Sequence, residues 1–340
     1  MTDLLSRLLS QHEWLITDGA TGTTLFEMGL SQGYPPEFWN VEQADKIKQH
    51  YRSFVEAGSD IVLTNTFGGT ANRLRLHKAQ DRVYAINLGA ARLLGEEIRR
   101  SGRPVVNAGS VGPLGDLFQP LGELTRRQGV EAFAEQIRGL KEGGVDVIWI
   151  ETMFSEDESR AAVEAAAYHD VPAVVTMSFD TSGRTMMGLA PGDFLGIARS
   201  VSPPLVAYGG NCGTGAPDLL AGLLPISEQL TSAEVFVVKA NCGLPQLIDG
   251  QVCYTGTPEL MAEYAIMARN LGARIIGGCC GTTADHIRAM REALSSAEKK
   301  SSPSLGDIIT RIGPLTGSAR SLVEGGGPVR RLRKQRQRAE

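Results

Sequence analysis

The sequence predicts a (β/α)8 barrel, an α/β fold, followed by a C-terminal extension. Two observations support this prediction. Eight short runs rich in branched apolar residues recur along the chain, and amphipathic stretches separate them. These runs are apolar almost throughout, which is typical of strands that a parallel sheet buries on both faces. Eight is also the number of parallel strands that closes a barrel.

The expected strands and helices alternate in order along the chain. Strands are expected at residues 14–18, 60–64, 104–108, 145–150, 173–178, 205–208, 236–240 and 274–277. Amphipathic helices are expected at 43–58, 82–102 and 129–144, and each of these stretches ends in glycine, a common helix C-cap. A last helix near 283–300 would close the barrel domain, which we place at residues 1–298.

A doubly wound open sheet is the competing fold class. It usually has fewer strands, and no G-x-G-x-x-G motif follows the first expected strand. The stretch DGATGTTL after that strand is glycine-rich, but its spacing fits neither a dinucleotide fingerprint nor a P-loop. The barrel is therefore the better prediction.

Composition narrows the class of protein and its partners. The chain is 42% hydrophobic and 21% charged, as soluble globular proteins are. No run approaches the roughly 20 apolar residues of a membrane span, and the N-terminus lacks the features of a signal peptide. We expect a cytoplasmic protein without a membrane partner. Residues 1–298 hold 35 acidic against 24 basic residues, which argues against a nucleic acid partner.

Residues 299–340 differ from the body of the chain. They are rich in Ser, Gly and Pro, and they hold ten Lys and Arg against three Asp and Glu. This composition predicts a basic tail that is either mobile or packed within an oligomer.

Three of the five cysteines follow expected strands. Cys212 in GGNCG follows the sixth strand, and Cys279 and Cys280 in GGCCG follow the eighth. In a barrel these strand ends meet at one rim, about 10 Å apart for strands two positions apart. The flanking glycines free the backbone from strand geometry, so adjacent thiols can turn toward one point. In a reducing compartment such a cluster indicates metal binding or catalysis.

Three converging thiols predict a Zn²⁺ site. Zinc favours sulfur ligands and tetrahedral geometry, and three protein ligands with one open position are typical of a catalytic site. A zinc ion surrounded by thiolates suits a substrate thiol, which can fill the open position, lose its proton and remain nucleophilic. The cluster therefore indicates chemistry on a thiol.

Five motifs, in this order, resemble the homocysteine S-methyltransferase family: DGATGTTL, NTFGGT, IET, GGNCG and GGCCGTT. The resemblance covers roughly residues 10–295. The family includes betaine–homocysteine methyltransferases, S-methylmethionine-dependent enzymes and the homocysteine module of cobalamin-dependent methionine synthase. The resemblance implies an enzyme that converts homocysteine to methionine, with Cys212, Cys279 and Cys280 as catalytic zinc ligands and a zinc-bound homocysteine thiolate that attacks a methyl donor.

The resemblance also implies how the amino acid is held. Asp18 and Glu151 match acidic residues that receive the homocysteine ammonium, and the backbone N–H groups of Gly19 and Ala20 match those that take its carboxylate. A glycine-rich turn exposes donors that suit an anion. The family uses no cysteine at the position of Cys242, and it leads us to expect a homo-oligomer.

The methyl donor is less well defined. Betaine, or a similar methylammonium or methylsulfonium compound, is the first candidate, because Trp39 resembles a tryptophan that betaine enzymes place near the donor. An indole face can hold a quaternary ammonium, worth about 0.5–2 kcal/mol. However, Gly68 and Thr152 stand where betaine enzymes carry tyrosines. The alternative is the homocysteine-activating subunit of a split cobalamin-dependent methionine synthase, with a separate corrinoid protein as partner.

Two further classes of protein are compatible with the cysteines. One is a non-catalytic partner protein that binds zinc through its thiols. The other is a redox sensor that uses the Cys279–Cys280 pair, although adjacent cysteines form strained disulfides and Cys212 would then have no role.

Overall fold

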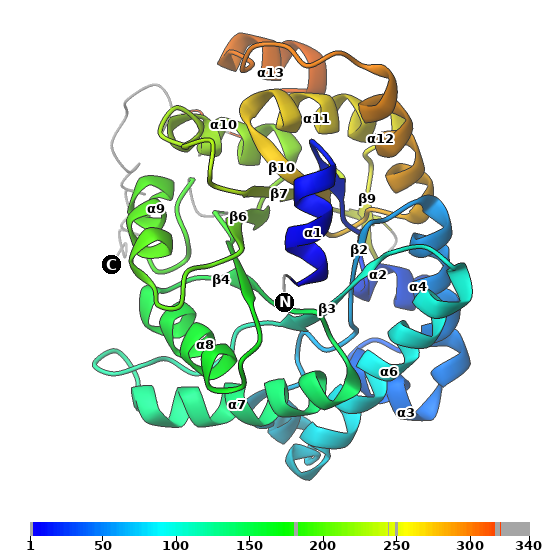
Figure 1. Ribbon diagram of the computed structural model, residues 1–340, viewed down its shortest axis with the longest axis vertical. Helices are drawn as coiled ribbons and strands as arrows, with labels where there is room; N and C mark the ends of the chain where they lie inside the picture. Colours follow the sequence, from blue (N-terminus) through cyan, green and yellow to red (C-terminus); the bar gives the residue numbers. More distant parts are fainter. Residues whose placement is uncertain (1–2, 180–182, 244, 249–250, 317–319, 321–340) are drawn as a thin grey trace, which may run out of the picture.

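The computed structural model describes residues 3–179, 183–243, 245–248, 251–316 and 320. Eight parallel strands form a barrel in the order β1-β10-β7-β6-β5-β4-β3-β2 (Figure 1). Successive barrel strands lie side by side, and the last of them, β10, pairs with the first, β1. The strands are β1 (Leu15–Ile16), β2 (Ile61–Leu63), β3 (Val106–Val111), β4 (Val147–Met153), β5 (Ala173–Met177), β6 (Ala207–Cys212), β7 (Phe236–Ala240) and β10 (Ala273–Gly278). The predicted fold class is confirmed.

The seam between β1 and β2 closes the barrel. Asp60 N donates to Ile16 O at 2.8 Å, and Asp18 N donates to Ile61 O at 3.0 Å. The Asp18 carboxylate adds a third bond across the seam, because its Oδ2 accepts from Leu63 N at 2.7 Å. Asp18 is thus held at the C-terminal end of the first strand by the closure of the barrel itself.

Helices surround the barrel on its outer side (Figure 1). The longer ones are α4 (Ala44–Ala57), α6 (Val83–Ser101), α7 (Arg126–Gly143), α8 (Glu156–Tyr168), α9 (Pro191–Ser200), α10 (Ala216–Ser227), α11 (Pro258–Leu271) and α12 (Ala284–Ser296). Short helices α2 (Gly22–Glu27), α3 (Trp39–Glu42) and α5 (Ala71–Leu74) follow β1 and β2. The helices expected at 43–58, 82–102, 129–144 and 283–300 are all present, and the first three end at glycines with positive φ.

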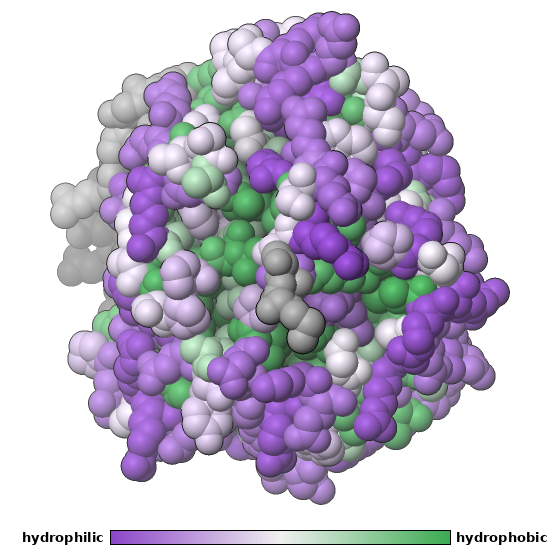
Figure 2. Space-filling model, in the orientation of Figure 1, coloured by the Kyte–Doolittle hydropathy of each residue, from purple (hydrophilic) through white to green (hydrophobic). Residues whose placement is uncertain are grey.

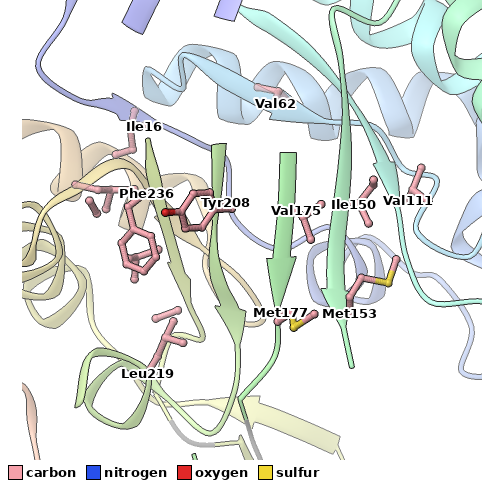
Figure 3. Packing of buried hydrophobic residues seen from close by; sticks show 14 of the residues in the cluster. Ile16, Val62, Val111, Ile150, Met153, Val175, Met177, Tyr208, Leu219 and Phe236 are labelled. Atoms are coloured by element: carbon pink, nitrogen blue, oxygen red, sulfur yellow. The ribbon is translucent and has the colours of Figure 1, made fainter. Parts of the chain in front are cut away.

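Successive side chains of a strand point to opposite faces, so the core of the barrel consists of two sets of side chains. One set of side chains, including Leu15, Trp149 and Ile275, fills the barrel interior. Helix α1 (Leu4–Gln11) lies across the N-terminal end of the barrel (Figure 1), and its buried leucines join this interior set. The other set packs the strands against the surrounding helices (Figure 3), and it includes Ile16 and Phe236. The interior is therefore a packed core on this side, and a cavity opens at the opposite end of the barrel.

The face that carries α1 is mostly hydrophilic. Hydrophilic side chains cover its rim, and hydrophobic ones show between them (Figure 2). Among the helices in the described parts of the chain, none combines the length and the apolar character that crossing a membrane requires.

The structure extends the sequence prediction in three places. β6 continues through Gly209 and Gly210 to Cys212. A side chain at position 209 would clash with β7, since a Cβ there would lie 1.8 Å from Val237 O, so the glycine allows the two strands to pair closely. A hairpin, β8 (Pro245–Ile248) and β9 (Gln251–Tyr254), follows β7 and was not expected. The segment after residue 298 forms α13 (Leu305–Ile312), which packs on α10 and α11.

Beyond residue 316 the basic segment, apart from residue 320, lies outside the described residues. Whether it is mobile or packs in an oligomer stays a prediction.

Tyr264 gives a test of the packing beneath the site. Its buried hydroxyl accepts from Ala240 N at 3.0 Å and lies 2.9 Å from Val238 O, so it joins α11 to β7. Tyr264→Phe leaves the Ala240 N–H without its partner, and we expect the free energy of unfolding to fall by about 1–3 kcal/mol. Chemical denaturation measures this change.

Tyr168→Phe is the matched control, since the Tyr168 side chain is 77% exposed on α8. We expect its effect to stay within about 0.5 kcal/mol. Equal stability of the two variants would contradict the role given to Tyr264.

Candidate metal centre

Three thiols converge at the C-terminal mouth of the barrel. The Sγ atoms of Cys212, Cys279 and Cys280 all lie within 4.8 Å of one another. The strand register explains why, because Ala240 at the end of β7 pairs with Cys212 on one side and with Gly278 on the other. Cys212 has a φ of +62°, outside strand geometry, where the chain turns at the end of β6. The structure thus brings together the three cysteines that the sequence singles out.

Two asparagines hold the loops that carry the thiols. Asn241 Oδ1 accepts from Cys280 N at 3.0 Å, while its Nδ2 donates to Gly213 O at 2.6 Å. Asn211 Nδ2 lies 3.9 Å from Cys279 Sγ, and Asn211 Oδ1 accepts from Thr152 N at 2.9 Å. The two thiol-bearing loops are therefore fixed relative to each other by side chains of β6 and of the loop after β7.

The thiols sit close enough to affect one another. The hydrogen bond with Cys212, together with burial, raises the pKa of the Cys280 thiol to about 12. A bound cation would stabilise the thiolates and oppose this shift. Cys242 behaves differently: it is buried, its thiol donates to Gly256 O at 3.2 Å, and it lies outside the cluster.

The thiols form one wall of a cavity of about 490 Å³ at the mouth of the barrel. Glu151, Thr152, Lys239, Gly19 and Ala20 also line it. This volume falls within the range of small-molecule sites. The cavity therefore has soft metal ligands on one side and polar or charged groups on another.

The two acidic residues expected to bind an ammonium have different surroundings. Glu151 lines the cavity and is partly exposed, and its Oε1 accepts from Ser110 Oγ at 2.5 Å. Burial raises the pKa of the Glu151 carboxyl. Asp18 is only 1% exposed and is not among the lining residues. Its Oδ1 accepts from Lys239 Nζ at 3.1 Å.

Lys239 is a site residue that the sequence interpretation missed. It lies on β7, is 2% exposed, and has its Nζ 5.4 Å from the centre of the Trp149 ring. Burial opposes its charge, but the nearby carboxylates of Asp18 and Glu151 raise the pKa of Lys239, so it stays protonated. A lysine inside the otherwise apolar run FVVKA was the available signal, since lysine is rarely buried without a partner.

The glycine-rich turn after β1 offers fewer free backbone N–H donors than the sequence predicts. Ala20 N already donates to Thr282 O at 2.9 Å, so a substrate carboxylate would have to compete for it. Among the described residues none accepts from Gly19 N. A Cβ at Gly19 would lie 2.2 Å from Thr282 O, which explains the glycine.

Trp39 does not reach the cavity. Its side chain is 7% exposed in the core, it is not a lining residue, and Lys46 Nζ covers its ring at 4.5 Å from the centroid. A contact between Trp39 and a methyl donor therefore has no support in this geometry. Tyr34 from the same loop does line the cavity, with its hydroxyl bonded to Glu42.

The fold and the site together define a barrel protein whose mouth can hold a metal ion beside a pocket for a small polar molecule. Comparison with known families makes this assignment more specific. Residues 15–294 match the family model for homocysteine S-methyltransferase, and the chain belongs to that family.

Individual relatives agree with the family assignment. The chain is 30% identical over 346 residues to a methionine synthase of Mycobacterium tuberculosis, covering 95% of the chain and 28% of the relative. It is 29% identical to the methionine synthase of Mycobacterium leprae, covering 86% of the chain and 25% of the relative. The chain thus spans about a quarter of the length of these relatives.

A solved structure shows the same fold. The metallated form of the homocysteine methyltransferase MmuM from Escherichia coli aligns with a TM-score of 0.71 and 23% identity, over 85% of this chain and 99% of that one.

Substitution of Asn241 tests whether its hydrogen bonds to the two thiol-bearing loops contribute to metal affinity. Asn241→Ala removes both bonds that tie the two thiol-bearing loops, and we expect a 10- to 100-fold lower affinity for Zn²⁺, as is typical when groups that orient ligands are lost. Competition with a chromogenic chelator measures this affinity. Asn72→Ala is the control, since Asn72 Nδ2 bonds Asp116 at 2.6 Å, outside the cluster. Equal affinities in the two variants would contradict the proposed role.

Proposed function

We propose that the chain is a zinc-dependent methyltransferase that converts homocysteine to methionine. The proposal is supported mainly by two features that line the same cavity. One is a set of three thiols whose sulfur atoms lie within 4.8 Å of one another, and the other is the partly exposed Glu151 carboxylate. The first suits a soft metal ion and a substrate thiol. The second suits the ammonium of an amino acid.

The cluster fits zinc by its chemistry. It consists of three sulfur atoms, which is the number of protein ligands in a catalytic zinc site with one open position. When bound there, zinc would act as a Lewis acid that favours the ionised form of a substrate thiol. Cys212, Cys279 and Cys280 are the residues that would hold it.

The other residues of the cavity would orient the amino acid. Ser110 donates to Glu151 Oε1, which fixes the carboxylate and leaves its other oxygen for the substrate ammonium. The Gly19 N–H is a candidate donor to the substrate carboxylate. Orienting the amino acid at these points would hold its thiol near the cluster, and holding reactants in place lowers the barrier to transfer.

The source of the methyl group has two candidates. Betaine or a similar small cation was the first candidate from the sequence, but Trp39, which motivated it, is covered by Lys46. A corrinoid-carrying partner is the alternative, and the exposed surface around the mouth favours it.

That surface is apolar. Large hydrophobic side chains are exposed on the segments that follow β1, β2, β3 and β5: Phe26, Tyr34, Phe67, Leu76, Leu117, Leu121, Met186 and Met187. A second hollow of about 440 Å³ adjoins the first and shares Phe67 and Arg73 with it. Gathered apolar exposure of this kind is typical of protein contacts, although ligand-binding grooves also show it. Similarity to methionine synthases supports the same choice.

One assay separates the candidates. The zinc-loaded protein is incubated with homocysteine and, in turn, betaine, dimethylsulfoniopropionate, S-methylmethionine or methylcobalamin, and methionine is measured. We expect methionine from methylcobalamin. Methionine from betaine alone would overturn the choice of donor, and zinc binding without methionine from any donor would favour a non-catalytic partner protein.

Loss of one thiol tests the metal assignment. Cys280→Ala leaves two sulfur ligands, so we expect the bound zinc to fall from about one per chain to below about a tenth, with methionine formation lost as well. Cys242→Ala is the control, because Cys242 lies outside the cluster. Metal analysis of the purified variants measures this. Full zinc content in Cys280→Ala would show that the assignment is wrong.

A further inference from the structure

The loop that follows Cys212 is short and has a constrained backbone. Three residues, from Gly213 to Gly215, join the end of β6 to the start of α10. Cys212, Gly213 and Gly215 have positive φ values of 62°, 77° and 150°. A residue with a side chain, such as Cys212, keeps this conformation only where its surroundings hold it. The contacts of the loop therefore decide where the Cys212 thiol lies.

Two side chains hold this loop, one from the segment after β7 and one from α10. Asn241 Nδ2 donates to Gly213 O at 2.6 Å. The Thr214 hydroxyl donates to Oδ2 of Asp218, which lies in the first turn of α10. Because the loop has only three residues, a shift of Thr214 would also shift Cys212.

Asp218 is shared with a distant segment of the chain. It is only 8% exposed. Its Oδ1 accepts from Thr316 N at 3.0 Å, and its Oδ2 accepts from the Thr316 hydroxyl at 2.5 Å. Hydrogen bonds to a carboxylate are about twice as strong as those between neutral groups. One carboxylate thus ties the Cys212 loop to a residue 98 positions further along the chain.

The segment that carries Thr316 is itself anchored, because α13 packs on α10 and α11 (Figure 1). Ile308 and Ile312 of α13 are buried in the core that surrounds the barrel strands. Leu315, the residue before Thr316, packs against Ala221 of α10. The Thr316 hydroxyl is therefore presented from a packed segment.

An alternative role for Asp218 is to stabilise the start of α10. A carboxylate in the first turn of a helix is favourable by about 0.3–1 kcal/mol. That role requires neither Thr214 nor Thr316, whereas both hydroxyls donate to Asp218. The shared contact therefore points to a link between the two segments.

We propose that Asp218 is a positioning residue for the proposed metal ligand Cys212, and that Thr316 braces the metal-binding loop through it. Thr316 lies outside both the cavity lining and the span that matches the family model. The C-terminal segment thus contributes to the site from a distance. This inference rests on the proposed zinc site, since it names what holds one of its ligands.

Removal of the Thr316 hydroxyl tests the brace in the full-length protein. Thr316→Val keeps the backbone bond to Asp218 and leaves the three cysteines and Asn241 unaltered. We expect about tenfold lower affinity for Zn²⁺, at the low end of the effect of groups that orient metal ligands. Competition with a chromogenic chelator measures this affinity. Thr316→Ser keeps the hydroxyl and should bind zinc as tightly as the unaltered protein.

A double variant tests whether the effect passes through the carboxylate. We expect Asp218→Ala to lower the Zn²⁺ affinity about 10- to 100-fold. Adding Thr316→Val should then cause no further loss, because its acceptor is gone. Should Asp218→Ala fail to fold, Thr214→Val serves as the background, since it detaches the loop and leaves Asp218 in place. Losses that add up in the double variant would overturn the proposal.

Thr231→Val is the matched control. Thr231 Oγ1 also donates to a carboxylate, Glu234 Oε2, at 2.9 Å, but this residue is exposed and does not line the cavity. We expect its Zn²⁺ affinity to be unchanged.

The Co²⁺-loaded proteins give a second readout, since the thiolate-to-cobalt absorption weakens when a cysteine leaves the metal. We expect this absorption to be weaker in Thr316→Val than in Thr231→Val. A lower melting temperature of Thr316→Val with unchanged zinc affinity and cobalt absorption would show that the contact only stabilises the fold, and would overturn the proposal. Failure of the proposed zinc site is distinct, because the unaltered protein itself would then bind no zinc.

Discussion

The site depends on the pairing of three parallel strands around one residue. Ala240, the last residue of β7, is in register with Cys212 on β6 and with Gly278 on β10. Because these strands are parallel, their C-terminal ends meet at one level, and thiols far apart along the chain come together. Cys279 N then donates to Ala240 O at 2.7 Å, and Tyr264 bonds Ala240 N from behind. A shift of one residue in this register would separate the sulfur atoms.

Much of this arrangement was predictable from the sequence. Eight apolar runs and glycine-ended helices predicted the barrel, and the placement of Cys212, Cys279 and Cys280 after two strands predicted their convergence. These features depend on local patterns and on the geometry of parallel sheets, which holds for any barrel. The convergence of the three cysteines could be predicted because the C-terminal ends of all the strands of a parallel barrel lie at the same rim.

Other features depend on contacts between distant segments, and the sequence could not reveal them. Asp18 and Lys239 are 221 residues apart, and nothing local in either strand indicates that they pair. The Ala20 N–H is used by Thr282 O, and the Trp39 ring is covered by Lys46. In each case a group expected to face the substrate is already satisfied within the protein. Burial and hydrogen-bond partners, which only the fold defines, decide which polar groups stay open.

The proposed function joins a thiol cluster, a carboxylate that would receive an ammonium, and exposed apolar side chains at one end of the barrel. It requires that sulfur atoms from two strand ends bind one zinc ion and leave a position for the substrate's sulfur. X-ray absorption at the zinc edge measures this arrangement. We expect three sulfur neighbours at about 2.3 Å, rising to four when homocysteine is added. A zinc environment with fewer sulfur atoms, or one that homocysteine does not change, would contradict the proposed zinc site.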